Sequence, residues 1–330
     1  MIHPIPPGTR DVLPEEMREL RRLQAALLEV FEGRGYGEVA TPALEYDEVL
    51  RRGGGRAHDA AYRFFDEGGE LLALRSEMTV PIARLVATRY AGTEPPHRFC
   101  YLAGAYRAVS PQRGEMREFT QAGVELIGAP EADGTGEVIE VLQETLDAAG
   151  LGSAVIGLGD ADLYRELVEE YGLGEKARAA VLERLGAHDL VGLEAELQSA
   201  GASGEQIETC LAISQLRGGV EVLERARGYN APAVTRAADR LDAIYRGLEQ
   251  REGGYRVQFD LGLMRDLAYY NGAILEVYDP AVGHVLGGGG RYDGLMDRFG
   301  LKLSAAGFAL NLERVHTAQI EERRRQGEGR

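Results

Sequence analysis

The chain reads RDLAYY at residues 265–270 and GGGGRYDGL at residues 287–295, and these two stretches decide which fold the sequence predicts. If the chain is extended at Tyr269 and Tyr270, the two rings point to opposite faces, so that one can pack while the other offers its hydroxyl group. Four consecutive glycines pack poorly unless the backbone closely approaches a ligand or makes a tight turn. A glycine run alone is a weak signal, but its continuation as RYDGL makes the pattern specific.

The composition favours a globular protein that binds small anions and other proteins. The 330 residues are 44% hydrophobic and 27% charged, which suffices for one large core or two domains. The net charge of −16 counts against binding of bulk nucleic acid, because a polyanion requires a basic stripe on the protein. Lysine occurs only at Lys176 and Lys302. The arginines that supply the remaining positive charge suit bidentate capture of carboxylates and phosphates.

Neither a membrane segment nor a disulfide or metal framework is expected. No uncharged apolar stretch approaches the roughly 18 residues of a membrane span. The start, MIHPIPP, lacks the basic and apolar regions of a secretory signal, so a cytoplasmic location is expected. Cys100 and Cys210 lie far apart without CxxC spacing, which indicates buried thiols and neither a disulfide nor a zinc site.

The first part of the chain alternates helix and strand patterns. Leu20, Leu23 and Leu27 recur as one face of a helix. We expect a helix at 14–33, a strand at 36–44 interrupted by Pro42, a mobile loop at 51–56, a hairpin of 62–66 and 71–75, and a helix at 79–90. The loop, RRGGGR, is either a plain flexible turn or a segment that becomes ordered over an anion.

The second part of the chain places a helical segment between strands. We expect strands at 99–109 and 118–127 around a polar loop at 110–117, a helix at 134–150, strands at 255–261, 273–278 and 282–286, and a charged helical end at 318–330. Between residues 162 and 252, strand signals vanish and helical periods dominate. Mostly antiparallel strand–loop–strand units with helices outside indicate an α+β fold. The sequence GLG at 157–159 lacks the third glycine of a dinucleotide-binding motif.

Two strand ends carry side chains suited to an amino-acid ligand. Glu77 and Thr79 stand where a strand meets a helix, and a carboxylate with a second acceptor there can hold an ammonium group. In the alternative interpretation, Glu77 is a solvated cap of the helix. Arg107 ends an otherwise apolar strand, and its guanidinium group can form a fork with a carboxylate or phosphate.

A second polar group follows on the next strand. Period-two geometry puts Gln121, Gly123 and Glu125 on one face of that strand. Singly, each is compatible with a surface position. Together they place polar side chains on one face of the sheet. If that face only formed a hydrophobic core, apolar residues would be expected there.

The chain resembles histidyl-tRNA synthetase over roughly residues 7–315. The similar stretches follow the same order and lie at residues 7–11, 74–79, 106–125, 265–270, 288–295 and 307–314. The resemblance implies a class II aminoacyl-tRNA synthetase-like fold, an antiparallel sheet flanked by helices, which dimerises through the first long helix and the strand carrying Pro42. It also implies that eight positions line a pocket for histidine and its adenylate: Glu77, Thr79, Arg107, Gln121, Glu125, Arg265, Tyr269 and Tyr270.

The nucleotide side of that pocket departs from the family pattern. The family's second class motif reads Arg-x-Glu, with the glutamate near adenine, whereas this chain has Val109 there. Its loop usually carries an arginine near the ATP phosphates, where this chain has Glu115. At about 5 Å and an effective dielectric near 20, such a reversal costs on the order of several kcal/mol. A glycine of the third motif is Asn311 here, although Arg314 is kept. The resemblance thus implies histidine binding beside an eroded nucleotide site.

Only 16 residues follow Arg314, so we expect no anticodon-binding domain. In this respect the chain resembles the family of ATP phosphoribosyltransferase regulatory subunits. That resemblance implies a non-catalytic subunit that activates a short-form ATP phosphoribosyltransferase catalytic subunit in the first step of histidine biosynthesis and confers feedback inhibition by histidine. It further implies a homodimer within a hetero-octamer, without tRNA, cofactor or metal.

The sequence predicts two parts of a synthetase-like core, at 1–161 and 253–318, a helical insert at 162–252 and a charged tail at 319–330. Two other functions are compatible with the motifs. One is a truncated enzyme that forms histidyl-adenylate for a non-tRNA acceptor, in which Arg107, Arg265 and Arg314 stabilise developing phosphate charge. The other is a tRNA-charging enzyme that works with a separate anticodon-binding protein, which the acidic balance disfavours.

Overall fold

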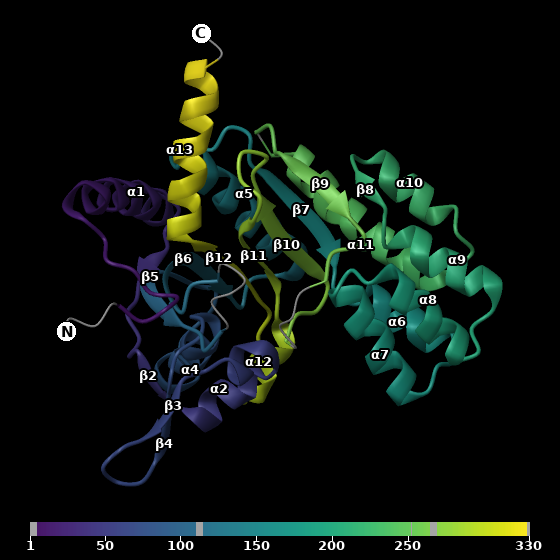
Figure 1. Ribbon diagram of the computed structural model, residues 1–330, viewed down its shortest axis with the longest axis horizontal. Coiled ribbons are helices and arrows are strands. Elements are labelled where there is room, and N and C mark those ends of the chain that lie inside the picture. Colours follow the sequence, from purple (N-terminus) through teal and green to yellow (C-terminus); the bar gives the residue numbers. More distant parts are fainter. Residues whose placement is uncertain (1–4, 110–114, 252, 265–268, 329–330) are drawn as a thin grey trace.

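Two β-sheets and the helices packed on them make up the fold, in a computed structural model that describes residues 5–109, 115–251, 253–264 and 269–328 (Figure 1). The strand order of the large sheet is β1 (Gly37–Glu38), β5 (His97–Tyr106), β6 (Glu118–Ile127), β12 (Ala305–Asn311), β11 (Val285–Arg291), β10 (Ala273–Tyr278), β7 (Val155–Asp160), β9 (Val257–Asp260) and β8 (Arg217–Gly218). The small sheet has the order β2 (Leu44–Tyr46), β4 (Leu71–Leu74) and β3 (Arg63–Phe65). Neighbours are antiparallel except in the β1–β5 and β7–β9 pairs, so the predicted α+β class is confirmed.

Each face of the large sheet has its own apolar core. One core is formed with α1 (Pro14–Gly33), α5 (Glu131–Ala148) and α11 (Pro232–Glu249). The other is formed with α2 (Asp47–Gly53), α4 (Thr79–Arg89) and α12 (Asp293–Arg298).

Strand β6 shows the division between the two faces. Ala122, Val124 and Leu126 belong to the core on the α1 side, so the residues that alternate with them face the α4 side.

The helices between β7 and β9 form a group at the right of Figure 1. They are α6 (Leu163–Glu170), α7 (Glu175–Gly186), α8 (Leu190–Ser199), α9 (Gly204–Ile213) and α10 (Glu221–Arg227). Helix α11 follows and packs on β7 and α5, which connects the group to the large sheet. The short strand β8 also lies in this stretch, where no strand was expected. The division of the chain at residues 161, 252 and 318 stays a prediction.

Helix α1 has the predicted bounds, and its sequence explains them. Pro14 occupies the first turn, where its missing N–H has no partner to lose. Its buried side chains recur every three or four residues: Leu20, Leu23, Leu27 and Phe31. The Phe31 ring meets the Phe308 ring of β12 edge to face, with centroids 6.1 Å apart. These contacts fix α1 on the sheet.

Most other predicted elements are present with ends that shift by no more than three residues. They are the hairpin of β3 and β4, helices α4 and α5, and strands β5, β6, β9 and β10. The charged helical end is part of a longer helix, α13 (Leu312–Glu328), which points away from the body at the top of Figure 1.

The predicted strand at 36–44 is wrong, because the chain divides there between two sheets. Gly37 and Glu38 pair in parallel with β5, and Leu44 begins β2 of the small sheet. Pro42 lies in the connection, where its missing N–H interrupts no ladder.

The predicted loop at 51–56 is also wrong, because both of its ends are helical. Helix α2 ends at Gly53, and α3 (Gly55–Asp59) follows after Gly54, whose φ is 67°. A Cβ atom on Gly53 would collide with Val80 of α4. Close packing between α2 and α4, and not chain flexibility, accounts for that glycine.

The glycine run lies inside strand β11, which extends to Arg291 and does not end at residue 286 as predicted. A Cβ atom on Gly287 would collide with the carbonyl oxygen of Ala309, and one on Gly289 with that of Gly307. For Gly287 and Gly289 the close approach is therefore to β12, and the tight-turn alternative is wrong. Gly287 and Gly288 also line the cavity described below. Strand β7 was not predicted; it includes the GLG sequence that was considered only as a nucleotide motif.

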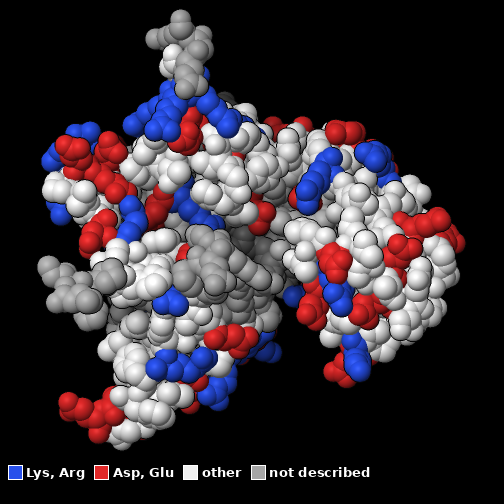
Figure 2. Space-filling view, viewed as in Figure 1, with Lys and Arg blue, Asp and Glu red and all other residues white. Residues whose placement is uncertain are grey.

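Both cysteines are buried and free, as predicted, and burial raises the pKa of the Cys100 and Cys210 thiols to about 12. No helix in the described part of the chain has the length and apolar character to cross a membrane. Figure 2 shows acidic and basic side chains interspersed over one face, and its described residues form no continuous basic stripe.

Candidate ligand pocket

A cavity of about 830 Å³ opens on the α4 side of the large sheet. Its wall comes from the β4–α4 corner, the facing ends of β5 and β6, the glycine-rich part of β11, and the start of α13. The predicted histidine-site residues on this wall are Glu77, Thr79, Arg107, Gln121, Tyr269 and Tyr270, and the predicted nucleotide-site residues are Val109, Glu115, Asn311 and Arg314. Arg265 lies outside the described residues. One cavity therefore brings together both halves of the predicted site.

Glu77 caps helix α4 from inside the protein. Its carboxylate accepts the backbone N–H of Thr79 at 2.6 Å and that of Val80 at 3.0 Å. The side chain is only 3% exposed, so the alternative of a solvated cap is wrong. Burial raises the pKa of Glu77, and the two backbone hydrogen bonds and the charge of Arg107 oppose this effect. A cationic ligand group beside this carboxylate would favour its charged form.

Arg107 follows the end of β5 and is held beside Glu77. Its Nε donates to the carbonyl oxygen of Ser76 at 3.0 Å. Its guanidinium carbon lies 4.9 Å from the centre of the Phe119 ring, a cation–π arrangement that fixes the plane of the fork. The predicted anion-binding group is thus oriented by the β4–α4 corner and by strand β6.

Strand β6 places Gln121, Gly123 and Glu125 on one face, as predicted; they stand opposite Asn311, Ala309 and Gly307 of β12. Gln121 is 8% exposed, and its Oε1 has no hydrogen-bond partner within the described residues. Because a buried acceptor without a partner costs free energy, this atom marks a position where a ligand donor fits.

Glu125 lies beneath the pocket wall and does not line the cavity. Its Oε1 accepts the Thr79 hydroxyl at 2.8 Å and the Tyr101 hydroxyl at 3.3 Å, and its Oε2 accepts a short bond from Tyr292. Burial raises the pKa of Glu125 to about 8, so the carboxyl group is mostly protonated at neutral pH. Glu125 therefore supports the floor of the pocket through Thr79.

Sequence reasoning missed two tyrosines of this floor. Tyr292 belongs to the RYDGL stretch, which was used only to make the preceding glycine run specific. Tyr101 gave no local signal, because it occurs in an apolar strand. Among the lining residues that were not predicted are Arg10, Glu276, His284 and Glu313.

Tyr269 and Tyr270 were expected to point to opposite faces only if the chain is extended there, and that condition is not met. Their ring centroids are 5.0 Å apart, and both side chains are buried and line the same cavity. The chain makes a turn here and is not extended. Tyr269 also meets Tyr292 edge to face at 5.9 Å. The three rings form an aromatic wall above Glu125.

At the other end of the cavity, polar groups bond to the protein's own backbone. Asn311 Oδ1 accepts the backbone N–H of Arg314 at 3.0 Å, which caps helix α13. Arg314 Nη1 donates to the carbonyl oxygen of Val285 at 2.8 Å. Glu313 accepts the N–H of Thr120 at 3.0 Å. The Val109 side chain is apolar, and the carbonyl oxygen of Val109 accepts a hydrogen bond from Nε of Arg117 at 3.2 Å. The described residues hold no group of three potential metal ligands.

Comparison with known proteins gives a consistent result. The family described as histidyl-tRNA synthetase matches residues 8–315. The ATP phosphoribosyltransferase regulatory subunit of Desulforamulus reducens is 42% identical over 94% of this chain and 78% of the relative, and that of Symbiobacterium thermophilum is 41% identical over 96% and 80%. A solved ATP phosphoribosyltransferase regulatory subunit/histidyl-tRNA synthetase from Bacillus halodurans superimposes with a TM-score of 0.88 at 31% identity, over 97% of this chain and 84% of that one. The predicted class II synthetase-like fold is confirmed.

Proposed function

The chain belongs to the family of ATP phosphoribosyltransferase regulatory subunits, within the histidyl-tRNA synthetase family, and we propose that it serves as the regulatory subunit of such an enzyme. It is a non-catalytic subunit that activates a short-form catalytic subunit in the first step of histidine biosynthesis. Histidine is the feedback effector, and it binds in the cavity described above.

The chemistry of the cavity around Glu77 is the main support for histidine as the ligand. The buried Glu77 carboxylate suits the ligand's ammonium group, and Gln121 Oε1, which has no partner within the described residues, offers a further acceptor. Arg107 suits the ligand's carboxylate. Tyr269 and Tyr270 line the space left for an imidazole ring. Arg265 is included in the proposed site on the strength of the family resemblance alone.

The Val109 end of the cavity supports a function without catalysis. Adenylate formation needs groups that stabilise charge on the phosphates as it develops. Here Glu115 adds negative charge to the wall, and Arg314 already donates to a backbone carbonyl oxygen. The alternative of a truncated enzyme that forms histidyl-adenylate is not favoured.

The mechanism is a shift of population between two states of the complex. If histidine binds one conformer of this subunit more tightly than the other, it stabilises that conformer by the difference in binding free energy. A catalytic subunit that is active only with the other conformer is then inhibited. By linkage, assembly with the catalytic subunit changes the affinity for histidine by the same factor as histidine changes assembly.

Reconstitution tests this proposal. The chain is mixed with a short-form ATP phosphoribosyltransferase, formation of phosphoribosyl-ATP is followed, and histidine is titrated. We expect little activity without this chain, activation with it, and inhibition by histidine that Gln121→Ala weakens. Equal activity of the catalytic subunit alone would refute the regulatory role. Unchanged inhibition in Gln121→Ala would refute the assignment of the effector to this cavity.

The proposed assembly is a homodimer within a hetero-octamer, located in the cytoplasm and independent of tRNA. The dimer contact by helix α1 and the segment around Pro42 is proposed from the family resemblance. The net charge of −16 and the mixed surface charge support the absence of tRNA binding. Native mass spectrometry of the reconstituted complex checks the stoichiometry. A filter-binding assay with histidine tRNA checks the expected absence of tRNA binding.

A further inference from the structure

The start of helix α6 holds the backbone that presents the pocket tyrosines. Arg165 Nη1 donates to the carbonyl oxygen of Tyr270 at 2.9 Å. Asp162 Oδ2 accepts the N–H of Gly272 at 2.7 Å, and the N–H of Ala161 donates to the carbonyl oxygen of Gly272 at 2.7 Å. Gly272 has a φ of 61°, which favours glycine. Three bonds from residues outside the cavity wall thus fix the turn that connects the tyrosines to β10.

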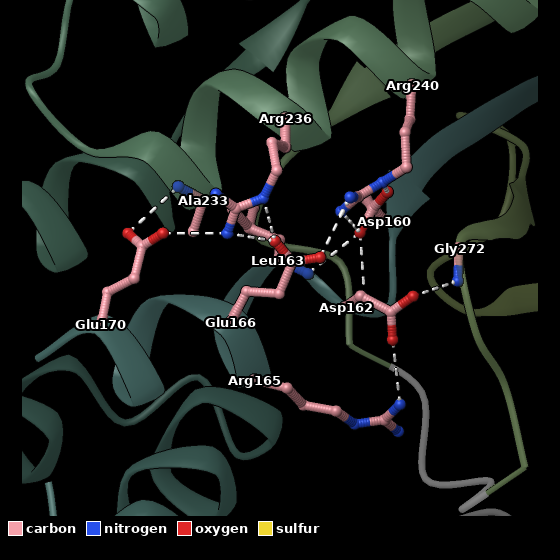
Figure 3. A network of polar contacts seen from close by, with 10 residues as sticks. All are labelled: Asp160, Asp162, Leu163, Arg165, Glu166, Glu170, Ala233, Arg236, Arg240 and Gly272. Carbon is pink, nitrogen blue, oxygen red and sulfur yellow. Dashed lines mark hydrogen bonds and ion pairs between the residues drawn. The ribbon is translucent and has the colours of Figure 1, made fainter. Parts of the chain in front are cut away.

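Asp160 anchors the start of α6 to helix α11 (Figure 3). The Asp160 side chain is completely buried. Its Oδ1 accepts the N–H groups of Asp162 and Leu163, each at 3.0 Å. Arg240 of α11 makes a fork with the same carboxylate, with Nε to Oδ2 at 2.7 Å and Nη2 to Oδ1 at 2.9 Å. A bidentate pair around a buried carboxylate has a defined geometry, so the start of α6 is held against α11.

The same two helices are joined by further ion pairs along their length (Figure 3). Arg240 Nη1 reaches Glu166 at 3.0 Å. Arg236 pairs with Glu166 at 2.6 Å and with Glu170 at 2.8 Å. The N–H of Ala233, at the start of α11, donates to Glu170 at 3.1 Å. A continuous set of polar contacts therefore runs from α11 through α6 to the turn beside the pocket.

We infer that Asp162 and Arg165 are positioning residues for the ligand pocket, and that they couple its occupancy to the packing of α6 on α11. The inference rests on the proposed function, because it concerns regulation through the same cavity. A ligand that contacts Tyr269 and Tyr270 restrains the turn that follows, and this strengthens the contacts of that turn with α6. By linkage, a change in the packing of α6 changes the affinity of the cavity by the same factor.

The exposure of Arg165 separates this role from a purely structural one. The side chain is 46% exposed, and its ion pair with Asp162 spans 3.3 Å. Exposed pairs of this kind add little to stability, so Arg165→Ala is expected to fold. A matched control is Arg178, which is 37% exposed and whose Nε donates to the carbonyl oxygen of Leu173 at 2.6 Å. This bond also lies in the α6–α7 region but does not touch the cavity.

Calorimetric titration of histidine into the reconstituted complex tests the coupling. Arg165→Ala is expected to raise the dissociation constant about five- to tenfold. Arg165→Lys, which keeps one donor, is expected to recover part of this loss, and Arg178→Ala to stay within about twofold of the wild type. The unfolding temperatures of the free Arg165→Ala and Arg178→Ala proteins are expected to agree. Equal affinities of Arg165→Ala and the wild type, or an equal loss in Arg178→Ala, would overturn the inference.

Amide hydrogen exchange of the free protein tests the positioning step without any ligand. In Arg165→Ala, the peptide that covers residues 269–273 is expected to exchange faster than in the wild type or in Arg178→Ala. Unchanged exchange overturns the inference even if histidine never binds. If the wild type does not bind histidine, the proposed effector is wrong, and the exchange result still decides the role of Arg165. The two failures are therefore distinguishable.

Discussion

The two ends of the cavity differ in how far the protein itself satisfies their polar groups. At the Glu77 end, the buried Glu77 carboxylate accepts two backbone N–H groups and also interacts with the Thr79 side chain and the charge of Arg107. Gln121, which stands opposite Asn311 on the neighbouring strand, has a buried Oε1 without a partner in the described part of the chain. At the Val109 end, Asn311 caps the helix that contains Arg314, and Arg314 itself donates to a backbone carbonyl oxygen.

This difference supports the proposed position of the ligand. A buried acceptor or carboxylate without a full set of partners lowers stability, and it is explained when a ligand supplies the missing donors. Asn311 and Arg314 both bond to the backbone, and neither has a buried side-chain atom without a partner within the described residues. The Glu77 end therefore has the chemistry that the proposed ligand requires, whereas Asn311 and Arg314 at the Val109 end bond to the backbone.

The largest expected effect is the absence of adenylation. The wild-type protein should show no histidine-dependent ATP–pyrophosphate exchange, because Val109 cannot hold adenine by a hydrogen bond and Glu115 repels the phosphates. Incorporation of labelled pyrophosphate into ATP measures this, with an active histidyl-tRNA synthetase as the positive control. Exchange above the protein-free background would show that the protein activates histidine with ATP. The two ends of the cavity would then not differ in their ability to bind a ligand.

The next effect concerns charge at the Glu77 end. Glu77→Gln keeps one of the two oxygens that accept N–H groups at the start of α4 and removes the negative charge. It should weaken histidine binding about 100-fold, because a buried ammonium group loses its counter-charge. Calorimetry on the complex measures this. Glu313→Gln is the matched control, because Glu313 also lines the cavity and also accepts a backbone N–H. A similar loss in both variants would mean that the two ends do not differ.

The next prediction concerns Glu125 and the pH dependence of the free energy of unfolding. Burial raises the pKa of Glu125 to about 8, so the folded protein keeps a proton that the unfolded chain has released at neutral pH. Stability should therefore fall as pH rises through the folded-state pKa, by about 2 kcal/mol between pH 6 and pH 8 for this group. Glu125→Gln, which has no titrating proton, should lose this component. Urea unfolding of both proteins at the two pH values measures the difference, and parallel pH profiles would contradict the assignment.

The smallest effect tests the scaffold role of Asn311. Asn311→Ala removes the cap of α13 and should cost about 1 kcal/mol, whereas Asn311→Gly, the residue expected in the synthetase pattern, should cost only a few tenths. Histidine affinity should stay within about twofold in both variants. Thermal unfolding and calorimetry measure the two quantities. A large loss of histidine affinity in Asn311→Ala would show that this end still takes part in binding.

Local patterns in the sequence predicted many of the elements, and the family resemblance named part of the cavity wall. The spacing of Leu20, Leu23 and Leu27 predicted helix α1, and period-two alternation placed Gln121 and Glu125 on one face. The predictions failed where distant segments decide the outcome. The glycines of β11 are required by the backbone of β12, and Gly53 by Val80 of α4. The sequence near Gly53 or near the β11 glycines does not indicate which distant residue each of these glycines packs against.

The sequence by itself determined the fold class, the order of the motifs and the residue types available for a ligand, because hydrophobic period and motif spacing are local properties. Only the tertiary structure decided how those residues are used. It placed Glu125 below the wall, turned both tyrosines into one cavity and joined Arg165 to Tyr270. Hydrogen bonds and burial depend on distances between segments that lie far apart along the chain, and those distances exist only after the sheet has formed.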